Sequence, residues 1–257
     1  MSRLIDKFNK AAKSSVQPMG FRTARATAPE PGILLILSLA ADAIKSASDI
    51  GNAGAVLIRP NDTPMTAASV KKITESLSDI PVGLYLEDTD DKEMAAFAEA
   101  GADFFVFPPS SRISAASEDK KSARILQVES AMDDSLLRAV NSLPVDAVLA
   151  ADTFTGGAMV WHELMIFQHL ANTMAKPLIV NIPANITEAE LKALWEAGAD
   201  GVVVEASAMK AGGLKKLQEL ISKLPQRSAR KRGKVDAVLP RTGPASAPPD
   251  EEEEEDE

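Results

Sequence analysis

The same five residues, Glu-Ala-Gly-Ala-Asp, occur twice in this chain, at positions 99–103 and 196–200. Each copy follows a segment with helical spacing and precedes an apolar run, at 104–107 and 202–204. Glycine ends a helix at little cost because it adopts positive φ, and a short, continuously apolar run is typical of a strand buried on both faces. The repeat therefore predicts alternating helices and buried strands, arranged in two similar halves.

Apolar runs of strand length recur along the whole chain, at 33–39, 55–58, 82–86, 104–107, 125–128, 145–149, 178–182 and 201–204. Segments with helical spacing follow them, at 42–50, 67–77, 92–100, 113–121, 134–140, 158–174, 188–197 and 214–224. Short loops in such an alternation favour right-handed βαβ units and an all-parallel sheet. Eight units are typical of an α/β protein that closes into a (β/α)8 barrel rather than of an open, doubly wound sheet.

Two segments flank the predicted barrel, which we assign to residues 32–225. Residues 1–31 comprise an amphipathic helix, with Leu4 and Phe8 on its apolar face, and a linker. Such a helix could plug the bottom of the barrel, or it could serve as an interaction arm or surface anchor. Residues 226–257 pass from a basic cluster into an acidic run, which predicts a disordered tail because too little apolar surface is available to offset its ordering entropy. The tail is either a solvating segment or an electrostatic arm for an unidentified partner.

The formal net charge is -9 at pH 7, but every residue from 250 to 257 is acidic, so the predicted barrel is only mildly acidic. This distribution argues against nucleic acid as a partner. The chain has no cysteine, which excludes thiol nucleophiles, thiolate metal sites and disulfides. No apolar run approaches the roughly 20 residues of a membrane span, and the N-terminus lacks a signal-peptide core. We expect a soluble, cytoplasmic protein that binds a small molecule, with homo-oligomerisation left open.

Ligands of (β/α)8 barrels meet the C-terminal ends of the strands, so the residues that close each predicted strand form the candidate site. In strand order they are Ser38, Arg59, Glu87 with Asp88, Pro108, Glu129, Asp152, Asn181 and Glu205. Because side chains alternate along a strand, Tyr85 shares a face with Glu87, and Gln127 shares a face with Glu129. The polar Gln127 indicates that the face it shares with Glu129 is the interior one.

Carboxylates at four of these strand ends predict one of two kinds of chemistry. They can ligate a hard cation such as Mg²⁺, or they can transfer protons next to a carbonyl when their pKa values are raised. We predict that Glu87, Glu129 and Asp152 are catalytic, and that Glu205 is a metal ligand together with Glu129 and Asp152. Arg59 would clamp a carboxylate or phosphate of the substrate. The alternative is that the acidic residues only open loops or cap helices.

A second candidate site is the segment 152–157, Asp-Thr-Phe-Thr-Gly-Gly, which lies between the sixth predicted strand and the helix after it. Adjacent glycines let the backbone approach a ligand closely, and free N–H groups at the start of a helix attract anions. Gly156 and Gly157 are therefore predicted to bind a phosphate or carboxylate. A loop without a ligand is the alternative interpretation.

The following helix carries both histidines of the chain, His162 and His169, which are spaced to share one face. A helix face lies outside the barrel mouth, and their spacing differs from that of the two-histidine zinc motif. We therefore expect packing or surface roles for both. Trp161, Phe167 and Leu170 in the same helix are expected to pack against the sheet.

The segment 178–205 carries a family resemblance. Its apolar strand ends in Asn181 and Ile182, Pro-Ala-Asn-Ile-Thr-Glu follows at 183–188, and Glu-Ala-Gly-Ala-Asp-Gly-Val-Val-Val occupies 196–204. It resembles the last quarter of aldolase-type TIM barrels, and similar stretches occur in thiamine-phosphate synthase, indole-glycerol-phosphate synthase and the flavin-dependent nitronate monooxygenases. The resemblance implies an aldolase-type (β/α)8 barrel without implying one specific family.

The resemblance also implies a phosphate site, built from paired glycines after the seventh strand and another glycine after the eighth. Here Ala184 and Asn185 stand at the first position, and Glu205 stands at the second. A carboxylate at that place repels phosphate by Coulomb interaction unless a metal ion or an arginine intervenes. Asn185, Ser207 and the turn that follows could preserve part of this site. We predict Asn185 and Ser207 as substrate-binding, together with Asn181 at the end of the seventh strand.

The leading functional hypothesis is a lyase or isomerase that acts on a small anionic metabolite, carboxylated or phosphorylated, through carboxylates at the strand ends. No lysine closes a predicted strand, which disfavours Schiff-base chemistry. The cofactor stays open: Mg²⁺ is compatible with the carboxylates, and FMN is less expected because a flavin enzyme would show a clearer phosphate cradle. One rival is a catalytically inactive barrel that acts as a binding or scaffold protein, and another is a flavin-dependent oxidoreductase.

Overall fold

The computed structural model describes residues 2–13, 32–41, 50–51, 53–60, 65–87, 90–112, 122–129, 132–151, 158–210 and 212–225. The predicted linker at 14–31 and the predicted tail at 226–257 lie outside these residues. So do the segment 152–157, with Asp152, Gly156 and Gly157, the residue Asp88, and nearly all of the two helices predicted at 42–50 and 113–121.

Eight parallel strands form a closed barrel in which each strand pairs with the next along the chain and the last pairs with the first. The strands are β1 (Leu34–Ala40), β2 (Ala55–Arg59), β3 (Val82–Tyr85), β4 (Phe104–Phe107), β5 (Ala123–Val128), β6 (Ala147–Ala150), β7 (Leu178–Ile182) and β8 (Gly201–Glu205). The predicted (β/α)8 architecture is therefore confirmed, with strand boundaries that differ from the sequence-based ones by two residues or fewer.

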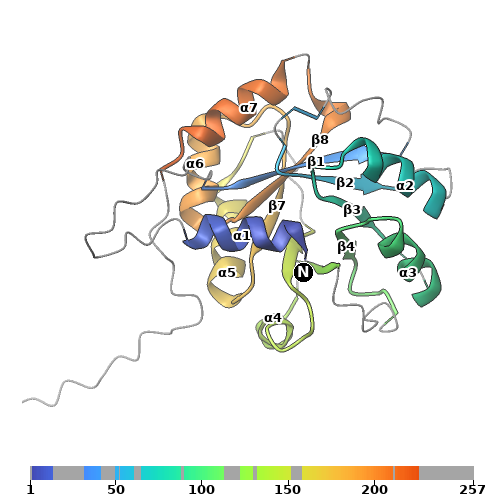
Figure 1. Cartoon of the computed structure of the whole chain (residues 1–257). Coiled ribbons are helices and arrows are strands. Elements are labelled where there is room, and N and C mark those ends of the chain that lie inside the picture. The colour runs from blue at the N-terminus through green and yellow to red at the C-terminus, as the bar shows by residue number, and fades with distance from the viewer. Residues whose placement is uncertain are drawn as a thin grey trace, which may run out of the picture.

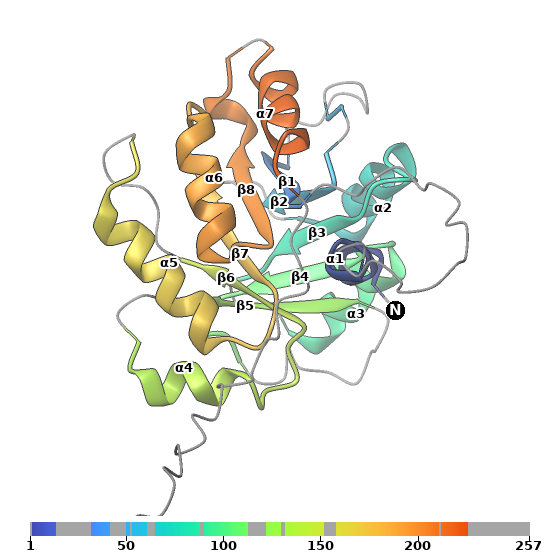
Figure 2. The same ribbon diagram turned by 90° about the vertical axis from the view of Figure 1, so that its left-hand side faces the viewer.

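Helices surround the strands on the outside (Figures 1 and 2). They are α1 (Arg3–Lys13), α2 (Ala67–Ser76), α3 (Asp91–Glu99), α4 (Asp134–Val140), α5 (Trp161–Thr173), α6 (Glu188–Ala197), the short 3-10 helix η3 (Ala206–Ala208) and α7 (Gly213–Ser222). Residues buried between helices and strands, such as Leu137, Phe167 and Leu191, form the outer part of the core. None of the helices in the described part of the chain is both long and apolar enough to cross a bilayer.

The repeated pentapeptide has the same structural role in both halves of the barrel. Gly101 and Gly198 have φ angles of 98° and 112°, which confirms that each glycine ends its helix in the left-handed region. The aspartates that close the two copies each hold a neighbouring segment at the N-terminal ends of the strands. Asp200 Oδ2 accepts a hydrogen bond from the backbone N–H of Leu178 at 2.8 Å, at the start of β7, and Asp103 binds α1.

Helix α1 closes the bottom of the barrel. The Asp103 carboxylate accepts hydrogen bonds from the Ser2 hydroxyl at 2.7 Å and from the backbone N–H groups of Arg3 and Leu4 at 2.8 and 2.9 Å. Leu4 and Phe8 are buried, and both belong to the same cluster as the side chains inside the barrel. The apolar face of this helix therefore completes the interior core rather than serving as a free arm.

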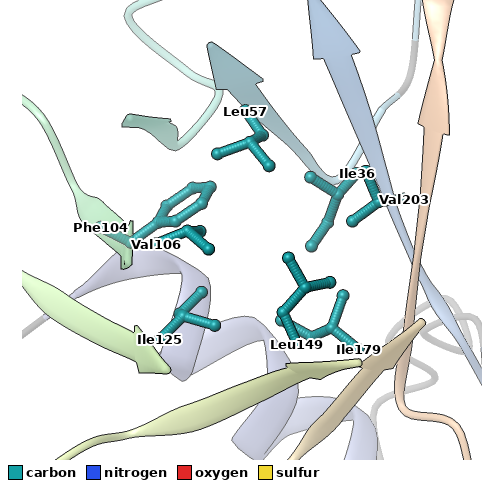
Figure 3. A pocket seen from close by; sticks show the side chains of 8 residues that line it. All are labelled: Ile36, Leu57, Phe104, Val106, Ile125, Leu149, Ile179 and Val203. Atoms are coloured by element: carbon teal, nitrogen blue, oxygen red, sulfur yellow. The ribbon is translucent and has the colours of Figure 1, made fainter. Parts of the chain in front are cut away.

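The middle of the barrel is a packed apolar layer. Figure 3 shows eight side chains that converge from the strands onto the barrel axis: Ile36, Leu57, Phe104, Val106, Ile125, Leu149, Ile179 and Val203. The space left between them is too small for a water molecule. Gly83 makes room for the Phe104 ring, since a Cβ at this position would lie 2.1 Å from a ring carbon. A ligand must therefore bind above this layer, at the C-terminal ends of the strands.

Candidate functional site

The interior of the barrel changes from apolar to polar one step above this layer. Side chains alternate along a strand, so the next inward position after each apolar residue lies two residues further on. On six strands this position is polar. Glu205 on β8 is exposed, and the other five residues are buried or half-buried: Ser38, Arg59, Tyr85, Gln127 and Asn181. We call these five residues the polar layer. Ser38 is buried and the other four are half-buried, so the polar layer forms the floor of the barrel mouth.

Arg59 is the central member of the polar layer. Its Nε–H donates to Ser38 Oγ at 3.1 Å, and its Nη2–H donates to Asn181 Oδ1 at 3.4 Å. The side chain thus reaches from β2 past β1 and β8 to β7. Asn181 Nδ2 in turn donates to the backbone carbonyl of Ala150 at 3.0 Å, which fixes the orientation of the amide so that its oxygen faces Arg59. These contacts hold the guanidinium in one place at the mouth.

The charge of Arg59 has no direct counter-ion in the part of the chain that the structure describes: none of its carboxylates lies within 4.0 Å of the guanidinium. Its contacts there are with neutral groups, namely a hydroxyl, an amide oxygen and the ring of Tyr85. An arginine in a protein stays protonated at all ordinary pH values. Among the described residues, the charge of the guanidinium is therefore met only by neutral partners.

Tyr85 supports Arg59 from the neighbouring strand. Arg59 Cζ lies 5.3 Å from the centroid of the Tyr85 ring, and the Tyr85 hydroxyl donates to Gln127 Oε1 at 2.6 Å. Burial raises the pKa of the Tyr85 phenol, and the negative charge of Glu87 raises it further, while Arg59 opposes the shift. The phenol is therefore protonated at neutral pH and acts as a hydrogen-bond donor.

Sequence reasoning assigned no role to Tyr85. The available signal was the strand alternation that places Tyr85 on the same face as Glu87, together with the fact that it is the only tyrosine in the chain. The contact with Gln127 crosses from β3 to β5, and it depends on the curvature of the closed barrel. Spacing along the sequence does not encode that curvature.

Three of the four predicted carboxylates are described, and they lie at the strand ends around the polar layer. Glu87, Glu129 and Glu205 continue the inward-facing series of β3, β5 and β8, and all three are exposed. The described residues contain no group of three or more histidine, cysteine, aspartate or glutamate side chains placed to hold a metal ion. The predicted metal set includes Asp152, which lies outside the described residues, so the Mg²⁺ site stays a prediction.

Two of the predicted binding residues near the β7 and β8 ends, Asn185 and Ser207, lie outside the polar layer. Asn185 is exposed in the turn before α6, and Ser207 is exposed in η3. The Ser207 hydroxyl donates to Glu205 Oε1 at 2.5 Å. The structure thus brings Arg59, Ser38 and Asn181 together, whereas Asn185, Ser207 and Glu205 form the adjacent rim.

Helix α5 lies away from this site. His169 Nε2 is 2.9 Å from Asp134 Oδ1 on α4, and both histidines are exposed, as expected of surface residues. Phe167 and Leu170 are buried, which confirms that they pack against the barrel. The expectation for Trp161 was wrong, because its side chain is 81% exposed and lies on the solvent side of the helix.

These features define a (β/α)8 barrel with an arginine-centred polar layer at the C-terminal ends of its strands. No family model and no curated protein matches the sequence. Solved structures do match the fold. A tryptophan synthase alpha-subunit from Pyrococcus furiosus is 13% identical, with a TM-score of 0.55 over 74% of this chain and 97% of that one. Tryptophan synthase from M. tuberculosis, in a ligand-free form, is 15% identical, with a TM-score of 0.58 over 86% of this chain and 97% of that one. A tryptophan synthase complex from Pyrococcus furiosus is 14% identical, with a TM-score of 0.55 over 76% and 98%. At these identities the likeness shows a shared fold.

Proposed function

We propose that the protein is an aldolase-type barrel enzyme, a lyase or isomerase, whose small anionic substrate binds to Arg59. One observation carries this proposal: a half-buried guanidinium stands at the mouth of the barrel, held by neutral partners and without a carboxylate partner among the described residues. The fold shared with tryptophan synthase alpha-subunits supports an enzyme rather than another kind of protein.

The hydrogen bonds of Arg59 leave donors for a ligand. A guanidinium has five N–H groups, of which the Nε–H is used by Ser38 and one Nη2–H by Asn181. Three N–H hydrogens are left, two on Nη1 and one on Nη2, so donors remain on both Nη atoms for two oxygens of one anion. Because Ser38, Asn181 and the Tyr85 ring already hold the side chain, little conformational entropy is lost when the anion binds.

The groups around Arg59 are suited to proton transfer. The Tyr85 phenol keeps its proton and donates a hydrogen bond to Gln127 on the floor of the mouth, and Glu87 and Glu129, two residues further along the same two strands, are candidate bases. Asp152 belongs to the same proposed set. Glu129 and Glu205 are the oxygen ligands that Mg²⁺ prefers, and with Asp152 they would hold it. The proposed anion site does not require the metal ion.

Isothermal titration calorimetry with small anions, including glycerate, pyruvate and inorganic phosphate, tests the proposal. We expect at least one of them to bind to the wild type, and Arg59→Gln to weaken this affinity tenfold or more. Arg59→Lys keeps the positive charge but loses the paired N–H donors of the guanidinium, so we expect an affinity between those of the wild type and Arg59→Gln. The matched control is Arg138→Gln, which removes an exposed arginine on α4 and leaves binding unchanged. Wild-type affinity in Arg59→Gln, or no binding of any of the anions to the wild type, would contradict the proposal.

A non-catalytic binding barrel is the second candidate. It is favoured by the composition of the polar layer, which contains no lysine, histidine or carboxylate. Such a protein would bind the same anions through Arg59. Its ligand would be recovered unchanged after prolonged incubation with the protein, and exchange of substrate protons with D₂O, followed by NMR, would be absent. Exchange of substrate protons that occurs in the wild type and is lost in Arg59→Gln would instead support an enzyme.

A further inference from the structure

The charges around the mouth restrict which anion Arg59 can hold. Arg59 is the one cation of the polar layer, and three exposed carboxylates stand at the surrounding strand ends: Glu87, Glu129 and Glu205. A ligand that approaches Arg59 must therefore pass a rim of negative charge. The cost of that approach rises with the charge of the ligand, because the repulsion is proportional to it.

Glu205 ends β8, the strand that lies between the strands of Ser38 and Asn181, the two hydrogen-bond partners of Arg59. In the strand register its Cα is the partner of the Cα of Ser38, and Ser38 is the residue that accepts the hydrogen bond from Arg59 Nε. Asn181, the other partner of Arg59, lies on β7, which pairs with β8 on its far side. The Arg59 side chain thus crosses the end of β8 on its way from Ser38 to Asn181. Glu205 closes that strand.

Ser207 adds to this arrangement. Its hydroxyl donates to Glu205 Oε1 at 2.5 Å, and a hydroxyl has a single hydrogen to donate. The hydroxyl that stands nearest in sequence to the end of β8 is therefore used to hold the carboxylate, and is not free to bind a phosphate oxygen. Both the charge and the hydrogen bond at this strand end oppose a phosphate group.

We propose that the mouth takes a monocarboxylate rather than a phosphate ester, and that Glu205 is the residue that determines this preference. The inference rests on the proposed anion site at Arg59 and names its ligand class. A carboxylate has one charge, and its two coplanar oxygens match one edge of a guanidinium. A phosphate monoester carries nearly two charges at pH 7 and has three oxygens to satisfy. A single arginine near the end of β8 neutralises a carboxylate, but it leaves a phosphate monoester with uncompensated negative charge.

Titration calorimetry with two probes of similar size, glycerate and glycerol 3-phosphate, tests this preference in the full-length protein with EDTA present. We expect the wild type to bind glycerate at least tenfold more tightly than glycerol 3-phosphate. In Glu205→Gln the phosphate probe should bind about five- to tenfold more tightly, while glycerate changes by less than threefold. Glu205 is exposed, so the substitution leaves the core intact. Glu219→Gln, an exposed carboxylate on α7, is the matched control and should not change the ratio.

Two further measurements test whether the preference depends on the charges of Glu205 and of the phosphate group. Ser207→Ala keeps the charge of Glu205 and should retain the wild-type preference. Lowering the pH from 8 to 5.5 converts the phosphate ester largely to its monoanion, since its second pKa is about 6. The difference in affinity between glycerate and glycerol 3-phosphate should therefore become smaller. Equal affinity of the wild type for both probes, or an unchanged ratio in Glu205→Gln, would overturn the inference. If Arg59→Gln abolishes glycerate binding in the same experiment, the anion site itself still stands. If Arg59→Gln has no effect, or if neither probe binds to the wild type, the proposed function fails as well.

Discussion

Arg59 lies over the ring of Tyr85, with its Cζ atom 5.3 Å from the ring centroid, and this contact joins β2 to β3 at the barrel mouth. The Tyr85 hydroxyl extends the contact to Gln127 on β5. A cation over an aromatic face contributes about 0.5–1 kcal/mol at exposed sites and about 2 kcal/mol when it is desolvated. At the half-buried position of Arg59 the ring is therefore a substantial part of what orients the guanidinium.

Two substitutions of Tyr85 separate the effect of the ring from that of the hydroxyl. Tyr85→Phe keeps the ring but loses the hydrogen bond to Gln127, so we expect a loss of about 1 kcal/mol in the free energy of unfolding and an anion affinity within twofold of the wild type. Tyr85→Leu also removes the ring, and the affinity should fall several-fold further. Urea denaturation and titration calorimetry measure the two quantities. Equal affinities in the two variants would show that the ring does not orient Arg59.

A pH-dependent contribution to stability is expected from Glu190 at the start of α6. Its carboxylate accepts hydrogen bonds from the Thr187 hydroxyl and backbone N–H, and from the backbone N–H of Met159 at 2.8 Å. Burial acts to raise the pKa of Glu190, but these hydrogen bonds outweigh it and hold the pKa below its ordinary value. A depressed folded-state pKa gives stability that is present above the unfolded-state pKa and is lost as the pH falls through the folded-state pKa.

We therefore expect Glu190→Gln to be less stable than the wild type by about 1 kcal/mol at pH 6, in line with the loss of a capping interaction. The difference should shrink as the pH is lowered to 3, because the wild-type carboxylate is then protonated. Urea denaturation at a series of pH values measures this change, with Glu219→Gln as an exposed control. A difference that stays constant between pH 6 and pH 3 would exclude the ionised carboxylate as its source.

The left-handed glycine of the second repeat leads to a stability prediction. Gly198 has φ of 112°, a region that costs other residues about 1–3 kcal/mol, so Gly198→Ala should lower the free energy of unfolding by that amount. Gly213 provides the opposite case, since it has no positive φ and its added Cβ would meet Met209 at an ordinary 3.4 Å. Gly213→Ala, in the first turn of α7, should be neutral or slightly stabilising. Similar losses in both variants would contradict the conformational explanation.

The strands and the location of the site could be predicted from the sequence because both follow from strong, local signals. Runs such as 104–107 are too apolar to be anywhere but inside, and parallel topology then places every strand end at the same mouth. Arg59 and Asn181 were predicted as binding residues in this way, and the structure brings their side chains into contact. Strand position alone does not reveal that Glu87 is exposed while Ser38 is buried, because exposure depends on how far each side chain rises above the layer below it.

The prediction for Trp161 failed for a different physical reason. Helix α5 reads Trp-His-Glu-Leu-Met-Ile-Phe-Gln-His-Leu-Ala-Asn-Thr, with apolar residues on more than one side, so periodicity does not identify the packed face. Phe167 and Leu170 occupy the side against the barrel, and Trp161 and Met165, one turn apart, are left on the solvent side. Only the tertiary contacts select between these faces.

The closure of the barrel bottom by α1 is tested by Phe8→Ala. Phe8 is 4% exposed and belongs to the interior cluster, and a Cβ at Gly201 would meet its ring at 3.1 Å, so the ring covers the start of β8. Truncation would open the lower end of the apolar core, and we expect a loss of about 3–5 kcal/mol in the free energy of unfolding. Urea denaturation measures it, with Lys10→Ala on the exposed face of the same helix as the control.

Asp103→Asn tests the same closure through its polar contacts. The carboxylate accepts three hydrogen bonds, from the Ser2 hydroxyl and from the backbone N–H groups of Arg3 and Leu4. An amide in its place offers one acceptor oxygen and removes the charge that favours the start of a helix, so we expect a loss of about 1–3 kcal/mol. Because both residues act by seating α1, the double variant should lose less than the sum of the two single losses. Full additivity would mean that Phe8 and Asp103 stabilise the barrel independently, and that α1 does not close it as one unit.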